Sequence, residues 1–457
     1  MLHRWLVRGV LLCAALSALI GQTAGAVQNS WYCEKAQSSE MSQYMDKNLA
    51  KYLGSIALGR DGWLFFSNAE LKMHFMPPGI KEVQALLRRT VQRLNARGTT
   101  LIFLPLPSRA LMHPDKIDPD NLLFKKYVAS EAQKQFRQYI SAMAKAGVVT
   151  IDLTLDVGRE ETGSTFYMAT DAHWSAEGAR LAAKAIANTL RRHSSYAKLK
   201  KVKYSLKEVR QFKKNGSIKI YLEKICGPID LQETVKVYEA VPDVNLQMSG
   251  MQNPAIVVTG TSNGHSNVRH GHSYSFPEFL AYYTDLPIAN YSNVGGHNFG
   301  ALLEFLRSDD FMNHPPRFLV WETPFNFGMP ISRSGLVQLA ASSAGFCAPN
   351  NIRYQQELSA EKGKEVVLKH ANLMTSQGSP DYLQISSGTE SPRSMDFLFQ
   401  FADGKERRVN IERNKHVSNN GRYFIELPES SQSPLTAIRI RPKDTAMQGA
   451  TIKLCKG

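Results

Sequence analysis

The sequence predicts an α/β unit whose parallel sheet carries helices on both faces, followed by an all-β sandwich module. From about residue 55 to about residue 330, apolar strand-like runs alternate with amphipathic helical segments, which is typical of a covered parallel sheet. After Cys347 the pattern changes to short alternating runs separated by Gly, Asn, Ser and Pro, which favours a small sandwich. A chain of 457 residues also exceeds one ordinary domain. We therefore expect a signal segment at 1–26 and domains at 27–345 and 346–457.

The elements of the first unit can be justified in chain order. A turn at Arg60-Asp61-Gly62 leads into a short buried strand, and the lysine-rich stretch around 205–224 has no assignable pattern. Helices are predicted where apolar residues recur at helical spacing, and strands where short apolar runs are bounded by turn residues. The helices are expected at 80–98, 126–147, 175–193, 276–284 and 300–308, and the strands at 99–109, 148–157, 254–262 and 316–324, with a strand followed by a turn at 286–296.

The sandwich module is predicted from five short runs. They lie at 381–387, 395–403, 407–413, 421–428 and 435–442.

The N-terminus has the pattern of a secretory signal. Arg4 and Arg8 precede an apolar run from Val10 to Ile20, and the small residues Ala24-Gly25-Ala26 follow. An uncleaved anchor is the alternative, although the apolar run is short for a membrane span. Cleavage after Ala26 lowers the formal net charge from +15 to +13, because two basic residues and no acid are lost. We expect the mature protein outside the cytoplasm, with no membrane span.

Charge and cysteine usage agree with export. A pI near 9.5 points to an acidic partner, and outside the cytoplasm an anionic polysaccharide fits better than a nucleic acid. Four cysteines remain after cleavage, and three pairings are possible. We favour Cys33–Cys226 and Cys347–Cys455, because each bond then closes one domain. No CxxC or CxxH spacing suggests a metal site.

Two short motifs carry the chemistry. In "TFYMATDAHWSAEGARLAAKAI", Asp171 and His173 stand directly before a helix, and in "VVTGTSNG" Ser262 stands where a buried strand should end. Serine needs an adjacent base, because its hydroxyl is a weak nucleophile at neutral pH. His173 can remove that proton, Asp171 can hold the imidazole tautomer, and the N–H of Ser262 can help to bind an oxyanion. Together the motifs predict Ser-His-Asp acyl chemistry.

Four motifs in fixed order also carry a family resemblance. "GRDGWLFF", "TDAHWSAEGA", "VVTGTS" and "FLVWETP" span roughly residues 55 to 330 and resemble the AlgX/AlgJ family of SGNH-hydrolase-like alginate O-acetylation proteins. In that family the Asp and His precede the Ser, as Asp171, His173 and Ser262 do here. The β module resembles the carbohydrate-binding sandwich that distinguishes AlgX from AlgJ. The resemblance implies periplasmic transfer of acetyl groups to mannuronate hydroxyls.

Further candidates lie near the two motifs. Gly296, with Gly295, and the amide of Asn298 are candidates for a second oxyanion donor, although a tight turn explains the glycines equally well. Glu322 ends a buried strand and is either an anchor for the site or a plain strand-end acid. His265, His270 and His272 crowd the region after Ser262, where a solvated loop fits better than a metal site. The predicted substrate contacts in this unit are Trp174, Arg269, His270 and Tyr274.

Basic residues recur within about thirty positions of the β module. Guanidinium groups suit a polyuronate, because each can bind a carboxylate through two hydrogen bonds, although a charge run is also typical of a solvated face. Tyr423 and Phe424 are candidate stacking surfaces. The basic residues are Arg393, Lys405, Arg407, Arg408, Arg413, Lys415 and Arg422.

The sequence as a whole favours a periplasmic O-acetyltransferase acting on an acidic exopolysaccharide, alginate by preference. It should be a monomer without cofactor or metal, with an acetyl donor and other exopolysaccharide-assembly proteins as partners. Three alternatives stay open: an esterase or deacetylase with the same triad, a non-catalytic polysaccharide-binding assembly subunit, and a different acidic polymer as acceptor.

Overall fold

The computed structural model describes residues 32–38, 40–156, 165–245, 253–267, 272–324, 332–369, 380–388, 391–428 and 433–457. The predicted signal segment and the candidate residues Arg269 and His270 lie outside these ranges. Within them, no helix has the length and apolar character needed to cross a bilayer.

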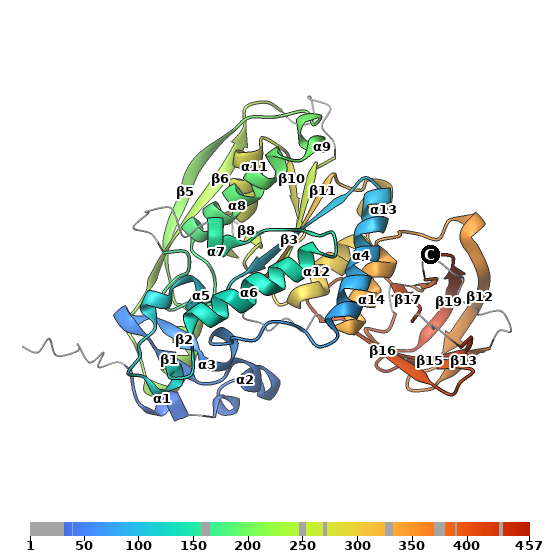
Figure 1. Cartoon of the computed structure of the whole chain (residues 1–457), viewed down its shortest axis with the longest axis horizontal. Helices are drawn as coiled ribbons and strands as arrows, with labels where there is room; N and C mark the ends of the chain where they lie inside the picture. Colours follow the sequence, from blue (N-terminus) through green and yellow to red (C-terminus); the bar gives the residue numbers. More distant parts are fainter. Residues whose placement is uncertain are drawn as a thin grey trace, which may run out of the picture.

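A five-stranded parallel sheet forms the centre of the larger unit (Figure 1). Its strand order is β10-β7-β11-β3-β4, and every neighbouring pair runs parallel. The strands are β3 (Thr100–Leu106), β4 (Val149–Thr150), β7 (Ile256–Thr259), β10 (Ile288–Asn290) and β11 (Phe318–Pro324). The predicted strand at 148–157 is wrong in length: β4 has two residues, because Asp152 accepts hydrogen bonds from the backbone N–H and hydroxyl of Thr154 and starts a helical turn.

Helices cover both faces of this sheet, as predicted. Alternate residues of β3 point to opposite faces, so Leu101 and Phe103 belong to one buried cluster while Ile102 and Leu104 belong to another. The first cluster includes residues of α4 (Ile80–Ala96), α6 (Ala129–Ala144), α12 (His297–Leu306) and α14 (Arg333–Ser342), and the second includes residues of α8 (Ala176–Arg191) and α11 (Phe276–Thr284).

The N-terminal segment folds against the lower left of the sheet in Figure 1. It contains α1 (Lys35–Ser38), α2 (Lys47–Leu53) and the antiparallel pair β1 (Ile56–Leu58) and β2 (Leu64–Phe66), with the predicted turn between them. A disulfide joins Cys33 to Cys226, the last residue of α10 (Ser217–Cys226).

The unassigned lysine-rich stretch forms the first arm of a long hairpin. Strand β5 (Tyr204–Lys214) pairs antiparallel with β6 (Glu233–Pro242), and the hairpin extends along one side of the molecule (Figure 1). Most side chains of β5 are exposed, so the strand lacks the apolar alternation that sequence reasoning uses to recognise strands.

The C-terminal part is the predicted sandwich of two four-stranded antiparallel sheets. Their orders are β12-β19-β14-β17 and β13-β18-β15-β16. The strands are β12 (Ile352–Ala360), β13 (Val366–Lys369), β14 (Tyr382–Ser386), β15 (Ser394–Phe401), β16 (Glu406–Glu412), β17 (Arg422–Glu426), β18 (Leu435–Pro442) and β19 (Met447–Cys455). The second disulfide joins Cys347 to Cys455, so both bonds have the pairing favoured from the sequence.

The sandwich docks on α4 and α14. Glu426 of β17 is 1% exposed and pairs with Arg89 and Arg93 of α4, at nitrogen–oxygen distances of 2.7 and 2.5 Å. The buried cluster that contains α4 and α14 continues into the sandwich interior. Short elements complete the fold: α3 (Ser67–Glu70), α5 (Arg109–Met112), α7 (Leu153–Asp156), α9 (Ser194–Ala197), α13 (Asp309–Asn313), β8 (Ser266–Asn267) and β9 (His272–Ser273).

Candidate active site

Ser262 lies three residues beyond the carboxyl end of β7, in a tight turn. Thr259 pairs with Trp321 in the register of β7 and β11, so Gly260 lies beside Glu322 of the neighbouring strand. A Cβ on Gly260 would lie 2.4 Å from Oε2 of Glu322, and therefore only glycine fits there. The local sequence Gly-Thr-Ser thus lets the chain turn at the sheet edge, where reactive groups of α/β folds gather.

Glu322 anchors this turn. Its buried carboxylate accepts the backbone N–H of Thr261 at 2.7 Å, the hydroxyl of Thr261 at 3.0 Å and the backbone N–H of Gly264. Burial raises the pKa of Glu322 to about 7, and the hydrogen bonds from Thr261 and Gly264 offset part of that rise. Of the two roles considered for Glu322, the contacts match the anchor.

The loop with Asp171 and His173 lies directly before α8. Ser175 caps that helix by accepting the N–H of Gly178 at 3.0 Å. Trp174 is fully buried, and its indole N–H donates to the carbonyl of Asn263 at 3.0 Å. Because Asn263 follows Ser262 directly, the tryptophan fastens the histidine loop to the serine turn across 89 residues of sequence.

Ser262, His173 and Asp171 form one continuous chain of hydrogen bonds. The Nε2 atom of His173 lies 2.8 Å from Oγ of Ser262, and Nδ1 lies 2.5 Å from Oδ1 of Asp171. The histidine side chain is 21% exposed and the aspartate is fully buried. A hydroxyl, an imidazole and a carboxylate in this order can move a proton from the hydroxyl to the ring while the carboxylate stabilises the imidazolium.

Every neighbour of the Asp171 carboxylate is a donor. Oδ1 also accepts the backbone N–H of His173 at 2.9 Å and the hydroxyl of Ser217 at 3.0 Å, while Oδ2 accepts the N–H of Ser217 at 3.1 Å and lies 2.9 Å from Nζ of Lys214. Burial alone would raise the pKa of Asp171, but His173 and Lys214 outweigh it and hold that pKa well below its usual range. The carboxylate therefore stays ionised.

Sequence reasoning missed Lys214 and Ser217. Lys214 ends β5 and Ser217 begins α10, so both come from the stretch whose pattern gave no assignment. Lys214 also donates to the hydroxyl of Tyr274, whose ring stacks on His173 with centroids 5.3 Å apart and planes 25° apart. Tyr274 is 5% exposed, so its ring supports the imidazole of His173 and offers little surface to a substrate.

The two residues predicted as donors for a second oxyanion contact, Gly296 and Asn298, have other neighbours. The N–H of Gly296 donates to the carbonyl of Asn293 at 3.4 Å, and both Gly296 and Asn298 line a cavity whose wall does not include Ser262. These contacts give no support to an oxyanion role, so their assignment stays a prediction. The N–H of Ser262 itself has no acceptor among the described residues, as expected for a group that binds an oxyanion.

Three predicted substrate contacts are buried inside the protein. Trp174 is enclosed by Phe166 and Phe276, and Tyr423, which was expected to stack on a sugar, is fully buried in the sandwich together with Phe424. Arg413 is 8% exposed and donates to Asn419 and to the carbonyl of Arg422. These assignments are wrong because all three side chains are buried: Trp174 packs in the core beneath its loop, Tyr423 belongs to β17, which is buried on both faces, and Arg413 follows β16 and bonds inside the sandwich.

The other basic candidates of the module are more accessible. Arg408 and Lys415 are exposed, and Arg422 reaches back to α12 and α13, where it donates to the carbonyl of Arg307 and pairs with Asp309. Nδ1–H of His265 donates to the carbonyl of Ser292, 2.9 Å away. Within the described ranges, no group of three or more His, Cys, Asp or Glu residues is arranged to hold a metal ion.

Comparison with known proteins identifies the family. The family described as "SGNH hydrolase-like domain, acetyltransferase AlgX" matches residues 56–325, well over half of the chain. The chain belongs to this family. Its matched region contains both motifs of the hydrogen-bonded chain, and the predicted fold class and family resemblance are confirmed.

Relatives of the AlgX family extend the match over nearly the whole chain. The "Alginate biosynthesis protein AlgX" of Pseudomonas aeruginosa is 25% identical over 430 residues, covering 92% of this chain and 87% of that protein. The "Probable alginate O-acetylase AlgJ" of the same organism is 25% identical but covers 59% of this chain.

Solved structures show the same fold. The structure of Pseudomonas aeruginosa AlgX aligns with a TM-score of 0.75 at 22% identity, covering 93% of this chain and 98% of that one. The O-acetyltransferase domain of Pseudomonas putida AlgJ aligns with a TM-score of 0.50 over 62% of this chain.

Proposed function

We propose that this protein is an exported O-acetyltransferase that modifies hydroxyls of an acidic exopolysaccharide, alginate by preference. The observation that carries the proposal is the hydrogen-bonded chain from Ser262 through His173 to Asp171. The names of its relatives, alginate biosynthesis protein and alginate O-acetylase, support the choice of polymer. The positive net charge suits a polyanion, and two disulfides suit the periplasm.

The first half-reaction would acylate the serine. Oγ of Ser262 attacks the carbonyl carbon of an acetyl donor while its proton passes to Nε2 of His173. The N–H of Ser262 stabilises the oxyanion. The bond between the acetyl carbon and the leaving group then breaks, and the leaving group takes the proton from His173.

The second half-reaction would transfer the acetyl group. A sugar hydroxyl loses its proton to Nε2 of His173 and attacks the acetyl carbon of the acyl-serine. The bond between that carbon and Oγ of Ser262 then breaks, and Oγ takes the proton back from His173. Asp171 stays ionised throughout both steps. Lys214 and Ser217 hold its carboxylate in place, and the stacked ring of Tyr274 holds the imidazole. A bound polymer must reach the acyl-serine before water does.

A chromogenic acetyl ester incubated with mannuronate oligomers tests the proposal. We expect a burst of chromophore equal to the enzyme concentration and oligomers that gain acetyl mass units. Ser262→Ala should reduce both signals by at least about 10⁴-fold. The matched control is Ser292→Ala, a buried serine in a neighbouring loop whose hydroxyl has no partner among the described residues, and it should leave both signals unchanged.

The alternatives give different results. Rapid release of free acetate with unmodified oligomers would indicate an esterase or deacetylase. A wild-type protein that binds the oligomers but shows no burst would indicate a non-catalytic assembly subunit. Transfer to another polyuronate in preference to mannuronate would replace alginate as the acceptor.

A further inference from the structure

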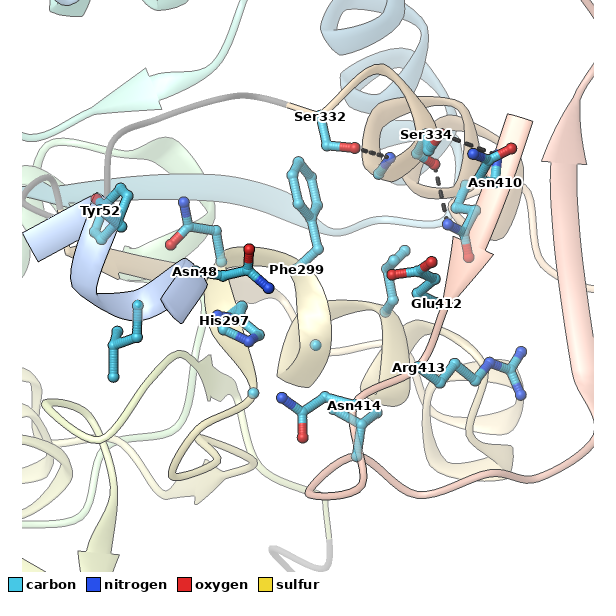
Figure 2. A pocket seen from close by; sticks show the side chains of 18 of the residues that line it. Asn48, Tyr52, His297, Phe299, Ser332, Ser334, Asn410, Glu412, Arg413 and Asn414 are labelled. Carbon is cyan, nitrogen blue, oxygen red and sulfur yellow. Dashed lines mark hydrogen bonds between the residues drawn. The ribbon is translucent and has the colours of Figure 1, made fainter. Parts of the chain in front are cut away.

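A cavity of about 810 Å³ lies between the helices of the α/β unit and the sandwich. Its wall combines α2, the N-terminal part of α12, the start of α14, and β16 with the loop that follows it, as Figure 2 shows. We call it the α12–β16 pocket. Its volume is in the range of cavities that hold small-molecule or sugar ligands.

One cation at this pocket has no partner among the described residues. Arg307 follows the last residue of α12, is 2% exposed and lines the cavity. Among the described residues its guanidinium forms no ion pair and donates no hydrogen bond, and its Nε is buried without an acceptor. A buried charge without a partner is costly, so a structure retains one where a ligand supplies the missing countercharge.

No carboxylate of the described residues forms an ion pair with Arg307. Glu304 raises the pKa of Arg307, and its own carboxylate accepts a hydrogen bond from the amide of Asn293 at 2.6 Å. The two carboxylates of the pocket wall have other contacts: Asp46 accepts the N–H of Asn48 at 2.9 Å, and Glu412 lies 3.7 Å from Nζ of Lys443. Burial and the second buried cation, Arg413, lower the pKa of Arg307. The guanidinium of Arg413 is turned away from Asn48 and His297 in Figure 2. It donates hydrogen bonds to Asn419 and to the carbonyl of Arg422, inside the sandwich.

The rest of the wall suits a sugar. Neutral amides and hydroxyls line it together with apolar side chains and the aromatic rings of Tyr52 and Phe299 (Figure 2). Its charged members are Asp46, Glu412, Arg307 and Arg413. The side-chain oxygen of Asn298 is buried without a donor, a second unsatisfied polar group in the same wall. The amides and hydroxyls of the wall include Asn48, Asn298, Ser334, Gln338, Asn410 and Asn414.

The pocket is also connected to the serine turn. Asn293 donates its backbone N–H to the carbonyl of Gly260 at 3.1 Å, and three residues later Gly296 enters the pocket wall. A Cβ on Gly295 would lie 3.0 Å from His416 of the sandwich, so this short segment is packed between the serine turn and the sandwich.

We propose that the α12–β16 pocket binds one uronate residue of the polysaccharide, with its carboxylate on the guanidinium of Arg307 and its hydroxyls on the surrounding amides. One guanidinium can hold one carboxylate through two parallel hydrogen bonds. The identity of the polymer in this proposal rests on the proposed function. The sandwich then contributes part of the wall of a polysaccharide-binding site.

Binding of a mannuronate hexamer and of a neutral mannose hexamer to the unreactive Ser262→Ala protein, measured by calorimetry, tests the proposal. Arg307→Met in that background should weaken binding of the uronate hexamer roughly 10- to 100-fold, because a hydrogen-bonded charge pair is lost. Arg307→Lys should recover part of the affinity. The matched control is Arg317→Met, which removes the same charge from an exposed position before β11.

Asn48→Trp provides a second test that leaves Arg307 in place. Asn48 is exposed on α2, its side chain faces the pocket, and a tryptophan there should obstruct a sugar and weaken binding of the uronate hexamer at least tenfold. Folded Arg307→Met and Asn48→Trp proteins that both bind the uronate hexamer like the parent would overturn the proposal. The proposal would also be overturned if the protein bound the neutral hexamer as tightly as the uronate hexamer. It would be overturned too if acetate displaced the uronate hexamer as effectively as monomeric uronate does.

The acyl-enzyme burst separates the two proposals, because it needs no polymer. If the burst is normal but Arg307→Met does not change the affinity for the uronate hexamer, only the pocket assignment is refuted. If Arg307→Met weakens binding but the wild-type protein shows no burst, only the transferase proposal is refuted.

Discussion

Asp171→Asn is the sharpest perturbation of the site, because no orientation of the new amide fits. The carboxylate accepts five donors: the backbone N–H and ring Nδ1–H of His173, the N–H and hydroxyl of Ser217, and the ammonium of Lys214. Whichever way the amide is turned, its NH₂ group faces donors. The substitution therefore removes the negative charge and also forces a donor–donor contact.

The expected loss follows from these contacts. A hydrogen bond to a charged group contributes roughly 1.5–3 kcal/mol. Losing the charge-assisted bonds to the His173 ring and to Lys214 therefore costs about 3–6 kcal/mol, which is about 10²- to 10⁴-fold in kcat/KM if it all appears in the barrier. The upper end agrees with what the same substitution does in other Ser-His-Asp triads.

The assay is kcat/KM for acetyl release from a chromogenic ester at pH 7, with circular dichroism to establish that the protein is folded. Asp152→Asn is the control, because Asp152 only accepts local hydrogen bonds at the start of α7, a role that the oxygen of asparagine can take over, and it should keep full activity. A folded Asp171→Asn protein that retains more than a tenth of wild-type kcat/KM would refute the assigned role of the carboxylate.

Three further predictions concern stability, each measured by urea unfolding. Burial raises the pKa of Glu322 from 4.5 to about 7, so the folded protein binds this proton more tightly than the unfolded chain does. The proton's contribution to the free energy of unfolding is therefore full below pH 4.5 and is lost as the pH rises through about 7. Glu322→Gln should remove that loss of roughly 3 kcal/mol, and an unchanged slope between pH 5 and 8 would contradict the assignment. Trp174→Phe should cost about 1–3 kcal/mol by leaving the carbonyl of Asn263 unpaired, whereas a neutral effect would show that the indole N–H does not fasten the loops. Glu426→Gln should cost about 3–5 kcal/mol because Arg89 and Arg93 lose their shared partner; a loss below about 1 kcal/mol would mean that this pair does not hold the sandwich on α4.

Much of the fold and the reacting residues could be predicted from local pattern. The apolar periods of α4, α6 and α8 and the continuous runs of β3, β7 and β11 are each encoded within about twenty consecutive residues. Ser262, His173 and Asp171 stand in short motifs at element ends, where α/β folds present reactive groups. The exposed strand β5 could not be predicted in this way, because a strand without a buried face lacks a hydrophobic period.

The sequence by itself determined the main helices and strands of the α/β sheet, that a serine follows a sheet strand, and that an Asp-x-His pair precedes a helix. Only the tertiary structure decided that Lys214 and Ser217 hold Asp171, that Trp174 and Tyr423 are buried, and that Arg307 lines a cavity with no partner among the described residues. The reason is physical: periodicity is set by neighbours along the chain, whereas burial and pairing depend on residues that packing brings together from distant positions.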